Sequence, residues 1–196
     1  MLAVSKGQDA QRIREAVGAG QKSFGENYVQ EAVQKMQFLP ALEWHLIGPL
    51  QSNKTRLAAE RFDWVQTVAS EKIARRLSEQ RPAHLAPLNV LIQVNVSGQA
   101  SKSGIEMDRV ESLARAVSAL PNLRLRGLMA IPEPAAERAP YRQMKQKYDS
   151  LKERFGFDTL SMGMSDDLDI ALAEGATMVR IGTAIFGPRK KQKDAA

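Results

Sequence analysis

The chain has 196 residues, of which 43% are hydrophobic and 26% are charged, a composition typical of one globular domain with a substantial core. It contains no cysteine, so disulfides, thiolate metal sites and cysteine catalysis are excluded. No apolar run approaches the roughly 20 residues of a membrane span, and residues 1–6 lack the layout of a signal peptide, so we expect a cytoplasmic protein without a membrane segment.

The formal net charge is +6, and half of it lies in residues 189–196, which carry four basic residues and one aspartate. We expect this segment to be a disordered basic tail that follows a single domain of residues 1–188. Nucleic-acid binding is not expected, because the chain has no finger spacing and no interleaved basic and aromatic run. Docking of the tail on an anionic protein partner stays open as an alternative.

Short apolar segments alternate with helical patterns along the whole chain. The segments that predict strands are residues 2–5, 23–25, 44–48, 64–68, 88–96, 124–131, 159–162 and 177–181. The segments that predict helices are residues 9–19, 28–36, 53–61, 71–81, 107–120, 139–155 and 166–173. The serines expected to cap helix N-termini are Ser52, Ser70 and Ser165. The glycines expected to end helices are Gly20, Gly156 and Gly175.

Alternation of strands and helices predicts a parallel sheet. Eight strands give about one unit per 25 residues, which suits a compact (β/α)₈ TIM-type barrel. An open doubly wound sheet is the rival fold, although it usually has fewer strands and a topological switch point. The chain begins directly on the first strand, so no preceding helix is expected to cover the bottom of the barrel.

The first predicted strand ends at Lys6. Barrel enzymes build their sites at the C-terminal ends of the strands. A lysine in this place can form a Schiff base with an aldehyde once its amine is deprotonated, which partial burial or nearby positive charge favours. A surface lysine after a strand is the alternative interpretation.

The last predicted strand runs into Gly182 and Thr183. Glycine lets the backbone approach an anion, and a short helix over residues 183–186 would offer free N–H groups. Barrels often bind phosphate after strands seven and eight, where Ser161 could add a hydroxyl. Because the first and last strands of a closed barrel are neighbours, Lys6 and this turn together describe a site for pyridoxal phosphate. A glycine needed only for a tight turn is the alternative.

Arg180 lies two residues before Gly182, so both residues can face the same side of the strand. An arginine inside a barrel strand needs a partner, because burying an unpaired charge is costly. It could bind the ring nitrogen or phosphate of a cofactor. The alternative is a salt bridge to one of the carboxylates of Glu26, Asp166 and Asp167.

Two further polar residues stand at or near strand ends. Asn27 could reach a cofactor oxygen or cap the helix that follows it. His45, within the third predicted strand, is expected to be a hydrogen-bonded interior histidine and not a catalytic base. No spacing of histidine, aspartate and glutamate suggests a metal site.

Seven segments taken together resemble the pyridoxal phosphate homeostasis protein family. They are LAVSK (2–6), FGENY (24–28), WHLIGPLQSNK (44–54), SKSG (101–104), RGLMAI (126–131), SMGMSDD (161–167) and VRIGTAIFG (179–187). They span nearly the whole chain in order. The sequence departs from the family pattern at Gly7-Gln8, where Thr-Lys is common, at Ala176, where serine is common, and in lacking an additional helix before the first strand.

The resemblance implies a fold type III barrel, similar to that of alanine racemase, with pyridoxal phosphate held as an internal aldimine on Lys6. Ser161, Gly182 and Thr183 would lie at the phosphate, and Arg180 near the pyridine nitrogen, which it would keep unprotonated. It also implies a non-enzymatic carrier or regulator that acts in vitamin B6 and amino-acid balance, with apo forms of enzymes that use the cofactor as partners.

An amino-acid racemase is the alternative function. Racemisation needs bases on both faces of the substrate carbon, and Lys6 could serve only one of them. In the related racemases the second base comes from an additional β-domain, usually across a dimer, and we expect this chain to lack that domain. A monomer is the expected oligomeric state.

Overall fold

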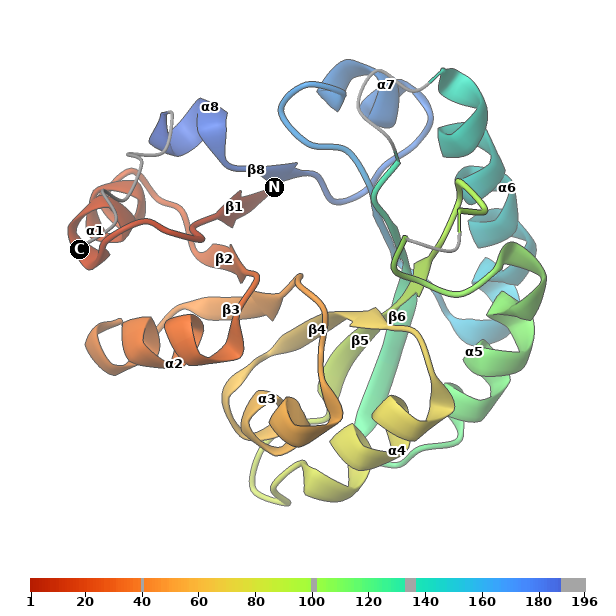
Figure 1. Ribbon diagram of the computed structural model, residues 1–196, viewed down its shortest axis with the longest axis horizontal. Coiled ribbons are helices and arrows are strands. Elements are labelled where there is room, and N and C mark those ends of the chain that lie inside the picture. The colour runs from red at the N-terminus through yellow and green to blue at the C-terminus, as the bar shows by residue number, and fades with distance from the viewer. Residues whose placement is uncertain (40, 100–101, 133–136, 188–196) are drawn as a thin grey trace.

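A computed structural model describes residues 1–39, 41–99, 102–132 and 137–187. Within these ranges, eight parallel strands form a nearly closed barrel in the order β7-β6-β5-β4-β3-β2-β1-β8, and Figure 1 shows them arranged as a ring. The strands are β1 (Leu2–Val4), β2 (Ser23–Glu26), β3 (Glu43–Leu46), β4 (Trp64–Val68), β5 (Leu88–Val94), β6 (Leu123–Ala130), β7 (Thr159–Ser161) and β8 (Arg180–Ile181).

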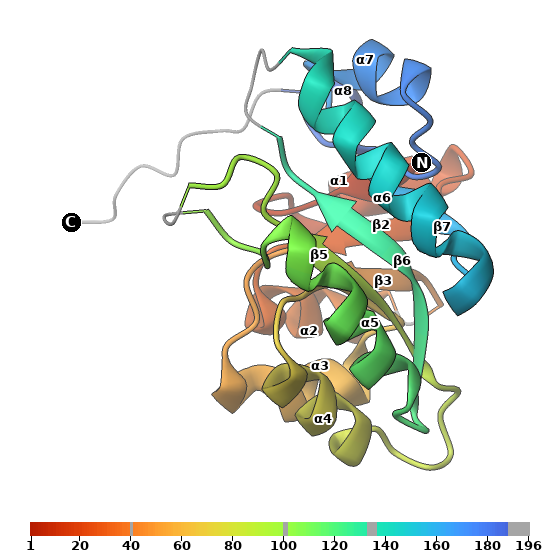
Figure 2. The same ribbon diagram turned by 90° about the vertical axis from the view of Figure 1, so that its right-hand side faces the viewer.

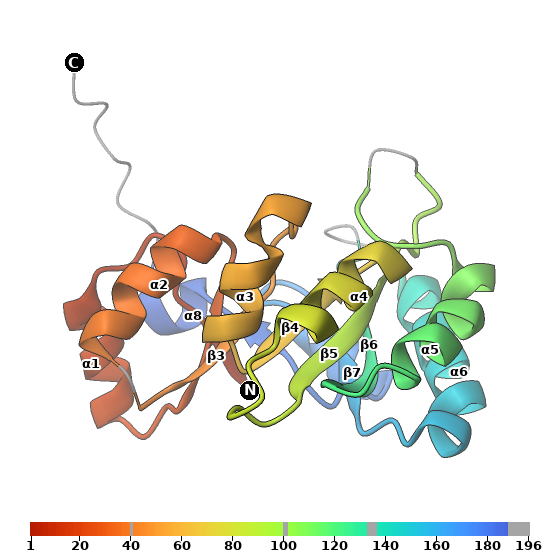
Figure 3. The same ribbon diagram turned by 90° about the horizontal axis from the view of Figure 1, so that it is seen from below.

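The helices surround this ring on its outer side (Figure 1). Figure 2 shows α5 and α6 against β5 and β6, and Figure 3 shows α3 and α4 beside each other on the outer side of β4 and β5. The helices are α1 (Ala10–Gly18), α2 (Val29–Phe38), α3 (Thr55–Arg61), α4 (Glu71–Gln80), α5 (Val110–Ser118), α6 (Arg138–Phe155), α7 (Leu168–Ala173) and α8 (Thr183–Phe186), with short 3₁₀ helices η1 (Ser52–Lys54) and η2 (Met107–Arg109). None of these described helices is long and apolar enough to cross a membrane.

The segment of residues 177–181 closes the barrel by contacting both of its neighbouring strands, each at a different position. Leu2 of β1 pairs with Arg180 of β8, so the first and last strands are neighbours as predicted. On the other side, within the described residues, β7 meets the segment before β8 through one isolated bridge, from Ser161 to Met178, where the N–H of Met162 donates to the carbonyl of Met178 at 3.1 Å. The strand predicted over residues 177–181 is therefore split between two neighbours. The (β/α)₈ barrel is confirmed, and the open doubly wound alternative is wrong.

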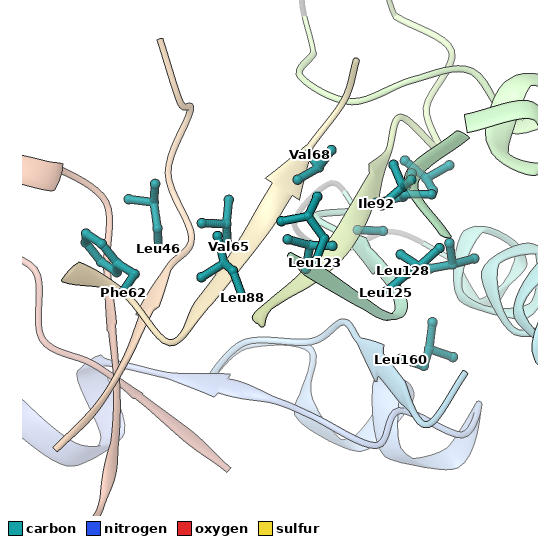
Figure 4. Packing of buried hydrophobic residues seen from close by; sticks show 14 of the residues in the cluster. Leu46, Phe62, Val65, Val68, Leu88, Ile92, Leu123, Leu125, Leu128 and Leu160 are labelled. Carbon is teal, nitrogen blue, oxygen red and sulfur yellow. The ribbon is translucent and has the colours of Figure 1, made fainter. Parts of the chain in front are cut away.

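The main apolar core lies between the strands and the helices. Side chains alternate along each strand, so Val90 and Ile92 face the helices, whereas Leu91 joins Trp64 and Met129 in a small separate cluster. Figure 4 shows part of the outer layer, in which side chains of β3 to β7 meet. Full burial of one such aliphatic side chain contributes about 1.5–3 kcal/mol, so this layer is a large part of what stabilises the barrel.

The helix ends confirm some of the predicted signals and correct others. Ser70 caps α4 by accepting the N–H of Ile73 at 3.3 Å, and Gly156 ends α6 in the left-handed conformation. The predictions for Ser52 and Ser165 are wrong. Ser52 is the first residue of η1, and the residue before α7 is Asp167. The predicted tail at residues 189–196 lies outside the described residues.

Substitution of Gly127 is expected to destabilise the barrel. Gly127 lies in β6 with a φ of +148°, and a Cβ there would stand 1.9 Å from the carbonyl oxygen of Thr159 in the paired strand β7. Gly127→Ala should lower the free energy of unfolding, measured by urea denaturation, by about 2–4 kcal/mol. The control is Gly18→Ala, because nothing lies within 4 Å of a Cβ at Gly18 in α1; it should stabilise the protein by up to about 1 kcal/mol. Equal effects at both positions would contradict this account.

Candidate functional site

A pocket of about 220 Å³ opens where β1, β7 and β8 end. Its walls come from the segment after β1, the loop after β7, and β8 with the turn that follows it. The lining residues are Val4, Lys6, Gln8, Met164, Ser165, Asp166, Arg180, Gly182, Thr183 and Gly187. The structure therefore brings four predicted site residues into one pocket, namely Lys6, Arg180, Gly182 and Thr183, and we refer to it as the Lys6 pocket.

Lys6 is half-buried, and the residues on both sides of it are tied to carboxylates. The Ser5 hydroxyl donates to Oε1 of Glu26 at 2.6 Å, and the N–H of Gly7 donates to Oε1 of Glu31 at 2.6 Å. These bonds join the segment after β1 to the end of β2 and to α2. The backbone around Lys6 is thus fixed from two elements, which directs its side chain to the pocket.

A buried lysine holds these two carboxylates together. Nζ of Lys35 donates to Oε1 of Glu26 at 2.7 Å, to Oε1 of Glu31 at 2.7 Å and to the carbonyl of Ser5 at 2.8 Å. Burial raises the pKa of Glu26, while its bond to Lys35 opposes this change. We call Ser5, Glu26, Glu31 and Lys35 the Lys35 clasp. No signal in the sequence joined these residues, apart from the i,i+4 spacing of Glu31 and Lys35 on one helix face.

The turn after β8 offers backbone donors to the pocket. The first N–H groups bonded within α8 belong to Ile185 and Phe186, and both donate to the carbonyl of Gly182, at 3.0 and 2.9 Å. The N–H groups that precede them have no acceptor within the turn, as at any helix start. Together with the Thr183 hydroxyl, this turn provides a set of donors that suits an anion.

The loop after β7 presents Met164 and Ser165 to the pocket. Asp167 is buried and accepts both the hydroxyl of Tyr141 and the N–H of Met164, the latter at 2.6 Å. Gly163 takes a φ of +92°, and a Cβ there would lie 2.3 Å from Cβ of Ala171. The loop conformation is therefore determined by tertiary contacts.

Ser165 is a hydroxyl-bearing pocket residue that the sequence interpretation missed, because it was assigned as a helix cap. The preference of barrels for phosphate after strand seven points to the loop beyond that strand, and this was the available signal.

Arg180 is buried, with 3% of its surface exposed, and contacts no carboxylate of the described residues directly. Its two terminal nitrogens donate to the hydroxyl of Ser161 and to the carbonyl of Ala130, each at 2.8 Å. In the described part of the chain it forms no ion pair with Glu26, Asp166 or Asp167, so that alternative is wrong. Burial lowers the pKa of Arg180 to about 10, against the opposing effect of Asp167, so the guanidinium is charged at neutral pH.

Two predicted site residues lie outside the Lys6 pocket. Ser161 is fully buried, and its hydroxyl bonds to Arg180 and Gln66 instead of facing the pocket. Asn27 lines a neighbouring pocket of about 320 Å³, and Met164 lines both pockets. Asn27 does not cap α2 either, because the N-cap is Tyr28 and makes no side-chain capping bond. His45 is fully buried and hydrogen-bonded, as predicted.

The donor set fits a small anion that carries an aldehyde. The pocket combines one amine, one guanidinium, a turn with N–H donors and two hydroxyls, while its carboxylate, Asp166, is exposed to solvent. Within the described ranges, no group of three or more histidine, cysteine, aspartate or glutamate side chains is arranged to hold a metal ion. An amine beside anion donors suits covalent capture of a phosphorylated aldehyde.

The comparisons with known proteins agree with this geometry. The sequence model of the alanine racemase N-terminal domain family matches residues 3–190. The pyridoxal phosphate homeostasis protein of Escherichia coli (strain K12) is 56% identical over 203 residues, which cover 98% of this chain and 87% of that protein. The protein of the same name from Pseudomonas aeruginosa is 60% identical over 196 residues, which cover 96% of this chain and 84% of that protein.

Solved structures show the same fold. PipY of Synechococcus elongatus, with PLP (pyridoxal phosphate) bound, matches with a TM-score of 0.85 at 38% identity, over 95% of this chain and 92% of that chain. An alanine racemase of Clostridium difficile matches with a TM-score of 0.77 at 14% identity, over 97% of this chain and 53% of that chain, and this shows the barrel fold alone. The chain therefore belongs to the alanine racemase N-terminal domain family and, within it, to the pyridoxal phosphate homeostasis proteins.

Proposed function

We propose that this protein binds PLP as a Schiff base on Lys6 and contributes to vitamin B6 and amino-acid homeostasis as a carrier or regulator. The observation that carries this proposal is the meeting of Lys6, Arg180 and the turn at Gly182 and Thr183 in one pocket. The relatives named for PLP homeostasis, and PipY with PLP bound, support the same conclusion. Covalent binding in this way would keep the reactive aldehyde of the cofactor contained.

Five residues of the Lys6 pocket have a proposed role. Lys6 supplies the amine that holds the aldehyde. Gly182, Thr183 and Ser165 donate to the phosphate, and Arg180 faces the ring nitrogen. In place of the predicted contact with the phosphate, we propose that Ser161 acts indirectly, because its hydroxyl accepts a hydrogen bond from Arg180 and holds it. Asn27 remains a proposed contact to the cofactor, from the neighbouring pocket across Met164.

The identity of the residue at the ring nitrogen argues against strong catalysis. A guanidinium can only donate hydrogen bonds, so a nitrogen that faces it must accept and stay unprotonated. An unprotonated ring withdraws electrons less well, which disfavours reactions that pass through a carbanion. We therefore propose that the protein does not catalyse turnover of amino acids.

A racemase remains the second candidate, because Asp166 also lines the Lys6 pocket and could act as a second base. The curated relatives named as homeostasis proteins are 53–60% identical to this chain, whereas the racemase is 14% identical, which supports the carrier. We further propose that the protein acts in the cytoplasm as a monomer and passes the cofactor to apo enzymes that require it.

Replacing Lys6 should abolish covalent capture of the cofactor. We expect the native protein to develop a visible absorption band with PLP, and Lys6→Ala to develop none, because no other amine is proposed to react in the pocket. Borohydride reduction of the native complex should attach the cofactor to the peptide that contains Lys6, as checked by mass spectrometry. The control is Lys72→Ala, at an exposed lysine of α4, which should keep the band. A band in Lys6→Ala as strong as the native one would contradict the proposal.

The racemase alternative has a direct assay. Conversion of L-alanine to D-alanine by the PLP-loaded protein should stay far below the roughly 1–1000 turnovers per second of ordinary enzymes. If turnover falls in this range and disappears in Asp166→Asn, the racemase would replace the carrier as the proposed function.

Breaking the Lys35 clasp should destabilise the fold and slow the capture of PLP by Lys6. Lys35→Met leaves Glu26 buried without its cation, so the free energy of unfolding in urea should fall by about 3–5 kcal/mol. Adding Glu26→Gln to Lys35→Met should recover part of this loss, because it removes the buried charge. The control is Lys145→Met, which breaks an exposed pair with Asp149 and should cost less than about 1 kcal/mol. Similar losses in both single variants would refute the structural role of the clasp.

A further inference from the structure

A chain of hydrogen bonds crosses the interior of the barrel and ends at Arg180. The Ser161 hydroxyl, which accepts from Arg180, donates to Oε1 of Gln66 at 2.7 Å. Nε2 of Gln66 lies 2.9 Å from Nδ1 of His45, and Nε2 of His45 lies 2.9 Å from Oε1 of Glu43. His45, Gln66 and Ser161 are all fully buried. The chain thus joins four strands, β3, β4, β7 and β8, and leads from the pocket to Glu43, whose side chain is 45% exposed.

The chemistry of Arg180 determines the direction of every bond in this chain. Arginine can only donate, so the Ser161 oxygen accepts and its own proton must go to Oε1 of Gln66. The amide group of Gln66 then turns its Nε2 donor toward His45. Nδ1 of His45 must accept, and the ring proton must be on Nε2, where it donates to Glu43.

The surroundings of His45 suit the neutral ring that this direction requires. Burial is the largest influence on the pKa of His45 and lowers it, against the opposing effects of Glu43 and Asp63. The ring stacks on Trp64, with centroids 5.0 Å apart and planes 10° apart. The hydrogen bond from His45 is also the main reason that the pKa of Glu43 falls to about 2, so Glu43 is an ionised acceptor at neutral pH.

We infer that Gln66 is a positioning residue for Arg180, and that neutral His45, by accepting from Nε2 of Gln66, holds Gln66 in the orientation that Arg180 requires. Without an acceptor at Gln66, the Ser161 proton has no partner in this chain, and the hydroxyl is free to rotate away from the guanidinium. Arg180 then keeps only its bond to the Ala130 carbonyl. This inference rests on the proposed function, because Arg180 is the residue proposed to face the ring of PLP.

Two substitutions of similar shape separate positioning from simple packing. Gln66→Met removes the acceptor of the Ser161 proton, and PLP should bind about tenfold more weakly, the effect of losing roughly one hydrogen bond to a charged group. Its visible band should also shift, because the donor at the ring nitrogen moves. Gln66→Glu keeps an acceptor for Ser161 and should retain more of the native affinity than Gln66→Met.

Inorganic phosphate is a probe for the proposed phosphate donors Gly182, Thr183 and Ser165, and it has no ring nitrogen for Arg180 to face. The affinity for phosphate itself, obtained from its competition with PLP, should be equal in the native protein and in both Gln66 variants. If Gln66→Met lowers the affinity for phosphate as much as the affinity for PLP, the effect is a general loosening of the site, and the inference is wrong.

The donor and acceptor direction of these hydrogen bonds can be measured without any change at Gln66. The protein has two histidines, so His84→Gln leaves His45 as the only imidazole in ¹⁵N NMR spectra. We expect a neutral ring with its proton on Nε2 at neutral pH. In Gln66→Glu both neighbouring side-chain oxygens accept, so His45 should become doubly protonated. A native ring protonated on Nδ1 would overturn the inference, whether or not Gln66→Met folds.

The outcomes separate this inference from the proposed function. If the native protein forms no visible band with PLP, the proposed function fails and the inference fails with it. If the native protein binds PLP, and folded Gln66→Met matches it in affinity and spectrum, only the inference is overturned.

Discussion

Leu2 pairs with Arg180 and Ala3 with Ile181, and this short ladder joins the first strand of the chain to the last. The parallel register brings the C-terminal ends of both strands to the same rim of the barrel. The segment after one strand carries Lys6, and the turn after the other begins at Gly182. The amine and the backbone donors are more than 170 residues apart in sequence, so the site forms only when the barrel closes. Any change that separates β1 from β8 therefore also disrupts the pocket.

The interior of the barrel serves this site more than it serves stability. The main core lies outside the strands, against the helices, and the inner apolar cluster consists of Trp64, Leu91 and Met129. Other inward positions hold the hydrogen-bonded chain from His45 to Arg180. Buried polar groups stabilise a fold little, yet they are costly when a partner is missing, so a complete chain restricts each member to one orientation. The buried hydrogen-bond chain therefore stabilises the fold less than an apolar interior would, but it fixes the orientation of Arg180 in the pocket.

The strand order and the meeting of Lys6 with Gly182 could be predicted because alternation and closure leave little freedom. The sequence could not predict that Ser165, and not Ser161, lines the Lys6 pocket. This outcome depends on the turn at Gly163 and on the contact of Asp167 with Tyr141. Local sequence describes neither feature. Likewise, the sequence suggested a hydrogen-bonded interior histidine, but Gln66 and Ser161 are 95 residues apart, and no pattern along the chain links them.

Two cations are buried near the pocket, and they are neutralised in different ways. Lys35 lies between the carboxylates of Glu26 and Glu31, so its charge is balanced within the protein. Arg180 bonds to a hydroxyl and a carbonyl, both uncharged, and Asp167 acts on it only without direct contact. Its positive charge is therefore compensated incompletely, and a buried charge of this kind favours an anionic ligand. The Lys35 clasp fixes the backbone that carries the amine without adding net positive charge, whereas Arg180 adds the charge that attracts the ligand. This division would let the same pocket hold its lysine rigidly and still bind the proposed phosphorylated aldehyde.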